Sequence, residues 1–255
     1  MGTAANWTRE QLLPALVLYH QLRFGQLDSR TPSIVALASK LGRTPGSVAM
    51  KLNNFASLDP VLKARGISGL RGASSLDRQV WGEFEQNREA FVERYQPEVE
   101  AAFQADGVAP SAEEDHSYDD VWRTTKTRKG QQFFRRMVLT DYANACCMTG
   151  LAEPKLLIAS HIVPWNADPA HRLDPANGLC LSTLHDRAFD AGLITVLPDY
   201  RIAVSDHIRQ HAETPIVKQW LVDLHGQEIR KPEKSWPSKE FLEYHNTKVF
   251  LGRSH

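Results

Sequence analysis

The sequence lacks several features that would place it in a special class of protein. No run of about eighteen apolar residues occurs in its 255 positions, so we expect no membrane-spanning helix. Its first residues lack a basic stretch followed by an apolar one, so we expect no secretory signal peptide. The three cysteines, Cys146, Cys147 and Cys180, are an odd number and do not suit a disulfide framework. These absences predict a protein of the reducing cytoplasm.

Net charge is also absent, but the charged residues are unevenly distributed. The chain has 30 Lys and Arg against 30 Asp and Glu. Residues 1–75 contain nine basic and three acidic side chains, residues 76–120 contain three and thirteen, and residues 121–136 contain six and none. Two basic blocks favour a polyanionic partner such as DNA or RNA. The alternative for either block is a solvated surface with no partner.

The first part of the chain is predicted to be mostly α-helical. Apolar residues recur at helical spacing over residues 6–24 and 76–95, and Pro97 is expected to break or kink the second helix. The stretch that follows is small, polar and acidic, as in a linker. We therefore predict a helical domain over residues 1–105, a linker over 104–117 and a second domain over 118–255.

Residues 33–60 predict two short helices joined by a turn that contains glycine. Gly42 is placed to end the first helix, and Thr44 is placed to cap the second. This is the layout of a helix-turn-helix, whose second helix enters the major groove in DNA-reading proteins. Arg43 and Lys51 are then candidate contacts to nucleic acid. The alternative is a helical hairpin with no role in binding.

The second domain is predicted to begin with a basic helix and to continue into short strands. Residues 130–142 have an apolar face, and Arg128 and Arg135 beside it are candidate contacts to nucleic acid. Two strands joined by a turn and two closing helices are predicted further along, at 193–197, 201–205, 214–225 and 238–250.

Three residues of the second domain form the most specific pattern in the chain. His161 ends the apolar run LLIASHI, Asn177 lies sixteen positions later in a turn, and His185 lies eight positions after that. His185 falls at the start of a predicted helix. This is the spacing of a ββα-metal nuclease, in which a β-hairpin followed by a helix places two histidines on either side of a cation.

The chemistry of phosphodiester hydrolysis gives each of these residues an expected role. The reaction needs a base to activate water, a cation to stabilise charge and a phosphate held in line. A histidine suits the base because its pKa lies near neutral pH. We expect His161 to be the general base and His185 the metal ligand. Asn177 is expected to bond backbone across its loop and orient the base, and Arg172 is a candidate phosphate contact.

Residues from about 127 to 205 resemble the HNH endonuclease family, specifically its restriction-endonuclease-like branch. The matching positions are Arg128, Gln131, Phe134, Arg135, Cys147, Thr149, Gly150, His161, Ile162, Pro164, Trp165, Arg172, Leu173, Asn177, Gly178, Leu179, Leu184, His185, Phe189, Asp190, Gly192 and Leu193. The resemblance implies a ββα-metal fold, a divalent cation and phosphodiester cleavage. The expected fold class is α+β, with a mostly α-helical N-terminal domain followed by a C-terminal ββα-metal nuclease domain with flanking helices.

Two positions depart from the pattern of the family. Many members carry Asp or His before the base as a second metal ligand, whereas this chain has Ser160. Colicin-type members add a histidine one helical turn after the ligand, whereas this chain has Phe189. We therefore expect a hard cation, Mg²⁺ or Mn²⁺, rather than a tight zinc site. The cysteines form no CxxC pair and are expected to be core residues.

The leading hypothesis is a metal-dependent endonuclease that cuts double-stranded DNA in restriction or anti-phage defence. The helical domain would engage duplex DNA, and the second domain would cut it. A homodimer would suit a double-strand cut, which often needs two active sites. One alternative is a helix-turn-helix regulator with a catalytically inactive HNH fold. The other is an HNH ribonuclease, although the lack of evident aromatic stacking platforms favours duplex DNA.

Overall fold

The computed structural model describes residues 6–67, 69–104 and 125–252, with the backbone alone described for residues 103–104 and 125–129. The chain divides into two compact units, Met1–Phe133 and Phe134–His255, and the division falls within helix α7 (Thr125–Asp141). The acidic linker expected over 104–117 lies outside the described residues, apart from Gln104, which ends α6. Among the described helices, none combines the length and the apolar character needed to cross a bilayer.

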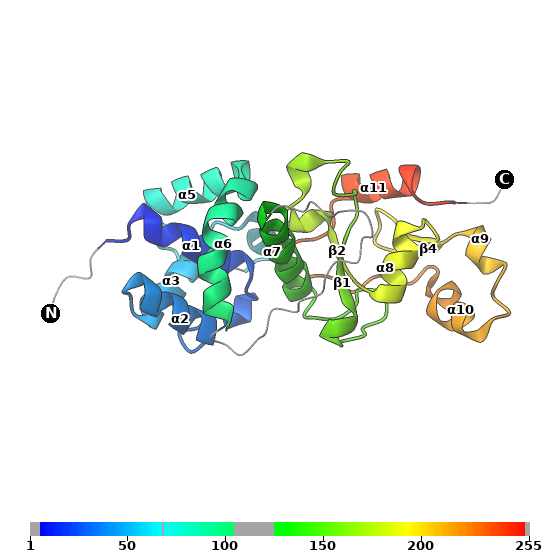
Figure 1. Ribbon diagram of the computed structural model, residues 1–255, viewed down its shortest axis with the longest axis horizontal. Coiled ribbons are helices and arrows are strands. Elements are labelled where there is room, and N and C mark those ends of the chain that lie inside the picture. Colours follow the sequence, from blue (N-terminus) through cyan, green and yellow to red (C-terminus); the bar gives the residue numbers. More distant parts are fainter. Residues whose placement is uncertain (1–5, 68, 105–124, 253–255) are drawn as a thin grey trace. The chain divides into compact units, whose positions relative to one another are not determined.

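The first unit is a bundle of α-helices around α1 (Figure 1). Helix α1 packs against α3, α5 and α6, and α2 packs against α3 and α6. Eight consecutive residues of α1, from Leu12 to Tyr19, are buried, so this helix forms the centre of the core. The helices are α1 (Arg9–His20), α2 (Pro32–Leu41), α3 (Pro45–Ala56), α4 (Pro60–Ala64), α5 (Ser75–Gln86) and α6 (Arg88–Gln104), with a 3-10 turn at Phe24–Gln26.

The expected end of α2 and the expected start of α3 are confirmed, whereas α2 begins at Pro32 and not after an expected cap at Ser33, and the helix does not end before Pro97. Gly42 ends α2 in the left-handed region at φ 64°, and the Thr44 hydroxyl accepts the Ser47 N–H at the start of α3. The helical segment from residue 75 breaks at Asn87, and Pro97 lies inside α6. Asn87 has φ −150°, and its side-chain oxygen accepts the Ala90 N–H and so caps the next helix.

The two basic side chains proposed as DNA contacts in this unit have partners within the chain. Lys51 is 7% exposed, and its Nζ lies 2.9 and 3.0 Å from the carboxylate oxygens of the fully buried Asp77. The Arg43 guanidinium donates to the Gln11 side chain and to a backbone carbonyl, and it lies 4.8 Å from the centre of the Trp7 ring. Lys51 therefore does not face solvent, and its expected contact with nucleic acid does not agree with the structure.

The cause of this disagreement is the burial of α3 on more than one side. Val48, Leu52 and Phe55 recur at helical spacing, and this spacing alone indicates a single buried stripe that does not include Lys51. In the structure α3 contacts α1, α2 and α5, so seven of its twelve residues are buried. A charged side chain in that position is stable because Asp77 neutralises it.

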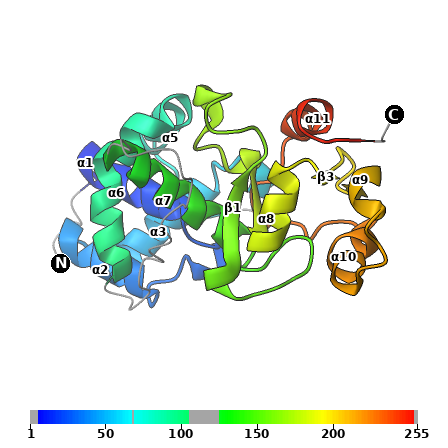
Figure 2. The same ribbon diagram turned by 45° about the vertical axis from the view of Figure 1, so that its right-hand side comes forward.

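The second unit contains two small antiparallel sheets among helices, which confirms the α+β fold class. Strand β1 (Leu157–His161) pairs with β2 (Gly178–Ser182), and β3 (Ile194–Val196) pairs with β4 (Ile202–Val204). Helix α8 (Thr183–Asp190) packs against the first hairpin, beside β1 and β2 in Figure 1 and beside β1 in Figure 2. The remaining elements are α9 (Asp206–Arg209), α10 (Pro215–Trp220) and α11 (Lys239–Lys248), with 3-10 turns at Pro154–Leu156, Pro169–His171, Pro175–Asn177 and Val222–Leu224.

Two of the predicted features of this unit are confirmed in detail. Strands β3 and β4 lie within the expected ranges, with the turn 198–200 between them. The cysteines Cys146, Cys147 and Cys180 are buried free thiols of the core. Burial raises the pKa of Cys180 to about 12, so its thiol stays protonated at neutral pH. Protonated buried thiols are poor metal ligands and poor nucleophiles.

Helix α11 is attached to the centre of the second unit through His245. The ring of His245 stacks on Phe189 of α8 with 3.6 Å between centroids, and its Nε2 donates to the Phe189 carbonyl at 3.1 Å. Its Nδ1 lies 2.9 Å from the Thr195 hydroxyl of β3. Burial lowers the pKa of His245 to about 4, so the ring is neutral at physiological pH. One neutral side chain thus connects α11 with α8 and β3.

We predict that Lys51→Ala lowers the free energy of unfolding by about 3–5 kcal/mol, because it leaves the Asp77 carboxylate buried without its counter-charge. Urea unfolding followed by circular dichroism measures this. Lys40→Ala is the matched control, since Lys40 is exposed at the end of α2 and its loss should change stability by less than about 0.5 kcal/mol. Equal stability of the two variants would contradict the claim that Lys51 neutralises the buried Asp77 carboxylate.

Candidate functional site

The first hairpin of the second unit brings His161 and Asn177 together. His161 is the last residue of β1 and pairs with Gly178, the first residue of β2. The chain leaves β1 at Ile162, whose N–H donates to the Asn177 carbonyl at 2.9 Å. The two ends of the loop 162–177 are therefore held together, by the pairing of His161 with Gly178 and by the hydrogen bond from Ile162 to Asn177. Residues sixteen positions apart become neighbours because the hairpin closes this loop.

The Asn177 side chain holds this loop in shape. Its Oδ1 accepts the Val163 N–H at 2.8 Å, and its Nδ2 donates to the carbonyls of Val163 at 3.2 Å and His171 at 3.3 Å. The residue is 1% exposed, so these hydrogen bonds satisfy polar groups that water does not reach. Asn177 thus connects both ends of the loop with its far side at residue 171.

The braced loop in turn orients the imidazole of His161. The Nε2 of His161 lies 3.0 Å from the Arg172 carbonyl oxygen, one residue beyond the carbonyl that Asn177 binds. A carbonyl only accepts hydrogen bonds, so Nε2 carries the proton and Nδ1 carries the lone pair. The ring stacks on Phe134 with 3.8 Å between centroids, and Trp165 lies edge-on at 5.3 Å. In its neutral form, a histidine held in this way can accept a proton from water at Nδ1.

Arg172 contributes to the site through its backbone as well as its side chain. Its Nε donates to the Trp165 carbonyl at 2.8 Å, and its guanidinium lies 5.2 Å from the centre of the Trp165 ring. These contacts place a cation on the loop whose carbonyl orients His161. The arrangement places an imidazole and a guanidinium on and beside one loop, and both kinds of group can assist hydrolysis of a phosphodiester.

Residues 146–197 match the protein-family model of the HNH endonucleases, a span that includes β1, β2, α8 and β3. The chain carries an HNH endonuclease domain. The span includes His161, Asn177 and His185, so the expected resemblance to HNH endonucleases is confirmed for this part of the chain, whereas the match does not test the restriction-endonuclease-like branch. A search of curated proteins found no match.

The HNH domain places His185 away from His161. The register pairs Leu157 with Ser182 at the end of the hairpin opposite to His161, about 13 Å along the strand for a separation of four residues. His185 is fully buried at that end. Its Nδ1 lies 2.6 Å from the Ser182 hydroxyl, and its Nε2 lies 2.7 Å from the Trp220 carbonyl at the end of α10.

Both ring nitrogens of His185 are therefore occupied by groups of the protein. Nε2 carries a proton because the Trp220 carbonyl can only accept, so the lone pair of Nδ1 accepts the Ser182 hydroxyl. Burial lowers the pKa of His185, which keeps the ring neutral. A metal ion needs a nitrogen lone pair, and this ring has none to offer. The expected role of His185 as metal ligand does not agree with this arrangement.

The surroundings do not supply a metal site by other means. Over the ranges that the structure describes, no group of three or more His, Cys, Asp or Glu side chains could hold a metal ion. Ser160 occupies the position where many HNH enzymes carry a second ligand, and its hydroxyl is buried without a hydrogen-bond partner among the described residues. The residues as arranged here thus do not fit a formed cation site around His185.

The remaining expected contacts to nucleic acid lie on or near α7. Arg135 donates to the carbonyls of Leu157 at 2.7 Å and Pro154 at 3.3 Å, which connects α7 with the start of β1. Arg128 lies in the part of α7 whose side chains are not described. The contribution of Phe134 and Trp165 to the orientation of His161 was not predicted from the sequence, although both had been noted as positions that match the family.

We predict that Asn177→Ala lowers the free energy of unfolding by about 1–3 kcal/mol and speeds amide exchange at Val163, because it leaves buried backbone groups without partners. Hydrogen exchange followed by mass spectrometry measures the local effect. Asp199→Ala is the control, since it removes one side-chain-to-backbone bond from the exposed turn after β3. Unchanged exchange over residues 162–177 in the Asn177 variant would show that Asn177 does not brace the loop.

Proposed function

We propose that the protein is a divalent-metal-dependent endonuclease that hydrolyses the phosphodiester bonds of double-stranded DNA. The observation that carries this proposal is the orientation of His161 within an HNH domain. Its Nε2 donates to the Arg172 carbonyl, which leaves the lone pair on Nδ1, as a general base requires. The family in general uses a divalent ion, for which Mg²⁺ or Mn²⁺ is our proposal.

The chemistry assigned to the residues of this chain is limited to proton transfer and positioning. Nδ1 of His161 accepts a proton from a water molecule whose oxygen attacks the phosphorus. The bond from phosphorus to the 3′-oxygen breaks, the leaving oxygen takes a proton from solvent, and a 3′-hydroxyl and a 5′-phosphate result. Arg172 is proposed to contact the phosphate, and Asn177 to keep the base in line through the loop. No step is assigned to the ion, because the described residues do not form a site for it.

The substrate and the biological setting are part of the same proposal. The basic blocks at residues 1–75 and 121–136 suit a polyanion, and duplex DNA is the form that we propose. The resemblance to restriction-endonuclease-like proteins supports a role in restriction or anti-phage defence. A cytoplasmic location and a homodimer that cuts both strands complete this proposal.

One alternative has a specific observation in its favour. Because His185 bonds to Ser182 and Trp220 and not to a site beside His161, the domain could serve as an inactive scaffold in a DNA-binding regulator. An HNH ribonuclease would use the same base and is distinguished by its substrate alone. Plasmid DNA incubated with Mg²⁺ or Mn²⁺ separates these functions. Nicked DNA supports the proposal, retarded intact DNA supports the regulator, and cleavage of RNA alone supports the ribonuclease.

We predict that His161→Ala reduces the rate of cleavage by about 10²–10⁴-fold, the usual contribution of a general base. Binding of DNA by the folded variant should stay within about twofold of the wild type. The matched control is His171→Ala, since His171 lies on the same loop, is exposed and pairs with Asp168. Cleavage at the normal rate by a folded His161→Ala protein would overturn the assignment of the base.

We predict that EDTA abolishes cleavage and that added Mg²⁺ or Mn²⁺ restores it. His185→Gln and His245→Gln each remove a buried histidine with two hydrogen bonds, so they form a matched pair. If His185 is structural, both variants lose stability and keep the wild-type half-saturating Mg²⁺ concentration to within about twofold. A large increase in that concentration for His185→Gln alone would show that the histidine does bind the ion.

A further inference from the structure

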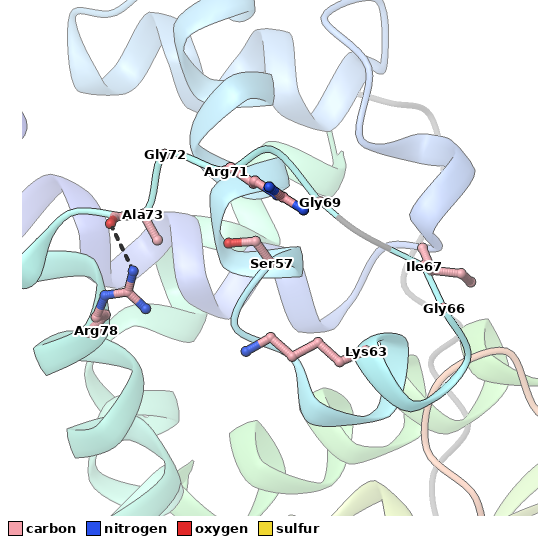
Figure 3. Close-up of a pocket in the computed structure, with 9 residues that line it drawn as sticks. All are labelled: Ser57, Lys63, Gly66, Ile67, Gly69, Arg71, Gly72, Ala73 and Arg78. Carbon is pink, nitrogen blue, oxygen red and sulfur yellow. Dashed lines mark hydrogen bonds between the residues drawn. The ribbon is translucent and has the colours of Figure 1, made fainter.

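The first unit contains a pocket of about 630 Å³ that lies outside the HNH domain. It is bordered by the C-cap of α3, by α4, by residues 66, 67, 69 and 71–73, and by the start of α5 (Figure 3). Three cationic side chains line it, and the lining includes no carboxylate. Figure 3 shows Arg71, Ser57 and Lys63 one below another, with the Arg78 guanidinium pointing toward them from α5.

Among the described residues, no side chain forms an ion pair with the positive charges of this pocket. In the part of the chain that the structure describes, Lys63, Arg71 and Arg78 form no ion pair. Lys63 Nζ is 3.4 Å from the Leu58 carbonyl and an Arg78 nitrogen is 3.5 Å from the Ala73 carbonyl, both at the long limit of a hydrogen bond. Three like charges around one space favour an anionic ligand.

The two acidic side chains nearest in sequence are already engaged. Asp77 pairs with Lys51, and Asp59 accepts the Tyr19 hydroxyl and the N–H groups of Val61 and Leu62. Both carboxylates are buried, at 0% and 7% exposure. They therefore do not line the pocket or cancel its charge at close range.

The loop that carries Arg71 is held firmly against α3. A Cβ on Gly69 would lie 2.3 Å from the Asn53 carbonyl oxygen and 2.5 Å from the Ser57 nitrogen. The next residue, Leu70, donates its N–H to the same Asn53 carbonyl at 3.2 Å. Only glycine permits this approach of two backbones. The pocket wall is thus fixed by main-chain contacts, which hold Arg71 over the space that Lys63 and Arg78 also face.

We propose that this pocket binds the phosphodiester backbone of nucleic acid and so positions the substrate of the nuclease from a separate unit. The ligand class rests on the proposed function, which makes DNA the substrate. Arginine and lysine are the side chains that contact phosphate oxygens, and such contacts fix position without reading sequence. In this proposal the first unit contacts DNA through the pocket and not through Lys51 of α3.

The test measures binding of a fluorescent DNA duplex in EDTA, where cleavage is absent, by fluorescence anisotropy over a range of salt concentrations. The triple variant Lys63→Ala, Arg71→Ala, Arg78→Ala should bind more weakly, and its plot of log K against log salt should be shallower by up to about three. Gly69→Ala keeps every charge but displaces the loop, so it should also weaken binding.

Lys40→Ala is the matched control, since Lys40 is an exposed cation of the same unit that does not line the pocket. Its affinity and salt slope should equal those of the wild type. A wild-type salt slope in the triple variant would overturn the proposal that the pocket binds DNA. A loss of binding in Lys40→Ala alone would overturn it as well. Competition with inorganic phosphate or AMP at constant ionic strength distinguishes the source of the phosphate. Saturable displacement at micromolar concentration would assign the pocket to a free nucleotide and overturn the proposal.

Failure of the pocket and failure of the proposed function give different results. If the wild type cuts DNA and the triple variant binds and cuts equally well, the proposed role of the pocket is wrong and the proposed nuclease function is supported. If the wild type binds duplex DNA through the pocket but does not cut it with any divalent ion, the proposed role of the pocket is supported and the proposed nuclease function is wrong. If the wild type neither binds nor cuts, both are wrong.

Discussion

The hydrogen bonds of the Asn177 side chain are the constraint on which the functional site depends. One buried amide binds the backbone at Val163, where the chain leaves β1, and at His171, on the far side of the loop. The next carbonyl along, that of Arg172, then meets His161 and determines which ring nitrogen carries the proton. In the proposed mechanism, an asparagine that binds backbone groups of the loop thus determines the tautomer and the direction of the base.

The sequence predicted that His161 ends a strand and that Asn177 lies in a turn. It also predicted most of the local structure around them. Strand-ending His161 and turn-forming Asn177 lie where the apolar run and the turn residues indicated, and β3 and β4 lie within their expected ranges. These features depend on short-range rules of strand, turn and cap. The family match over 146–197 agrees with them.

The partners of polar side chains could not be predicted, because they come from elements distant in the sequence. His185 has the expected position in α8, but its ring bonds to Trp220, 35 residues away. Lys51 has the expected place in α3, but Asp77 of α5 neutralises it. Periodicity shows which residues share a helix face and not how many neighbours cover that helix. The break at Asn87 was missed although a local feature accompanies it, since the Asn87 side chain caps the helix that follows.

The central claim is that His161, oriented by the braced loop, is the base of an HNH nuclease. Chemical rescue tests it most directly, because His161→Gly leaves a space beside Phe134 that free imidazole can enter. The account predicts that this variant is folded, cuts DNA at a small fraction of the normal rate, and regains activity in proportion to neutral imidazole. Cleavage by the folded variant at the wild-type rate, without imidazole, would contradict the account.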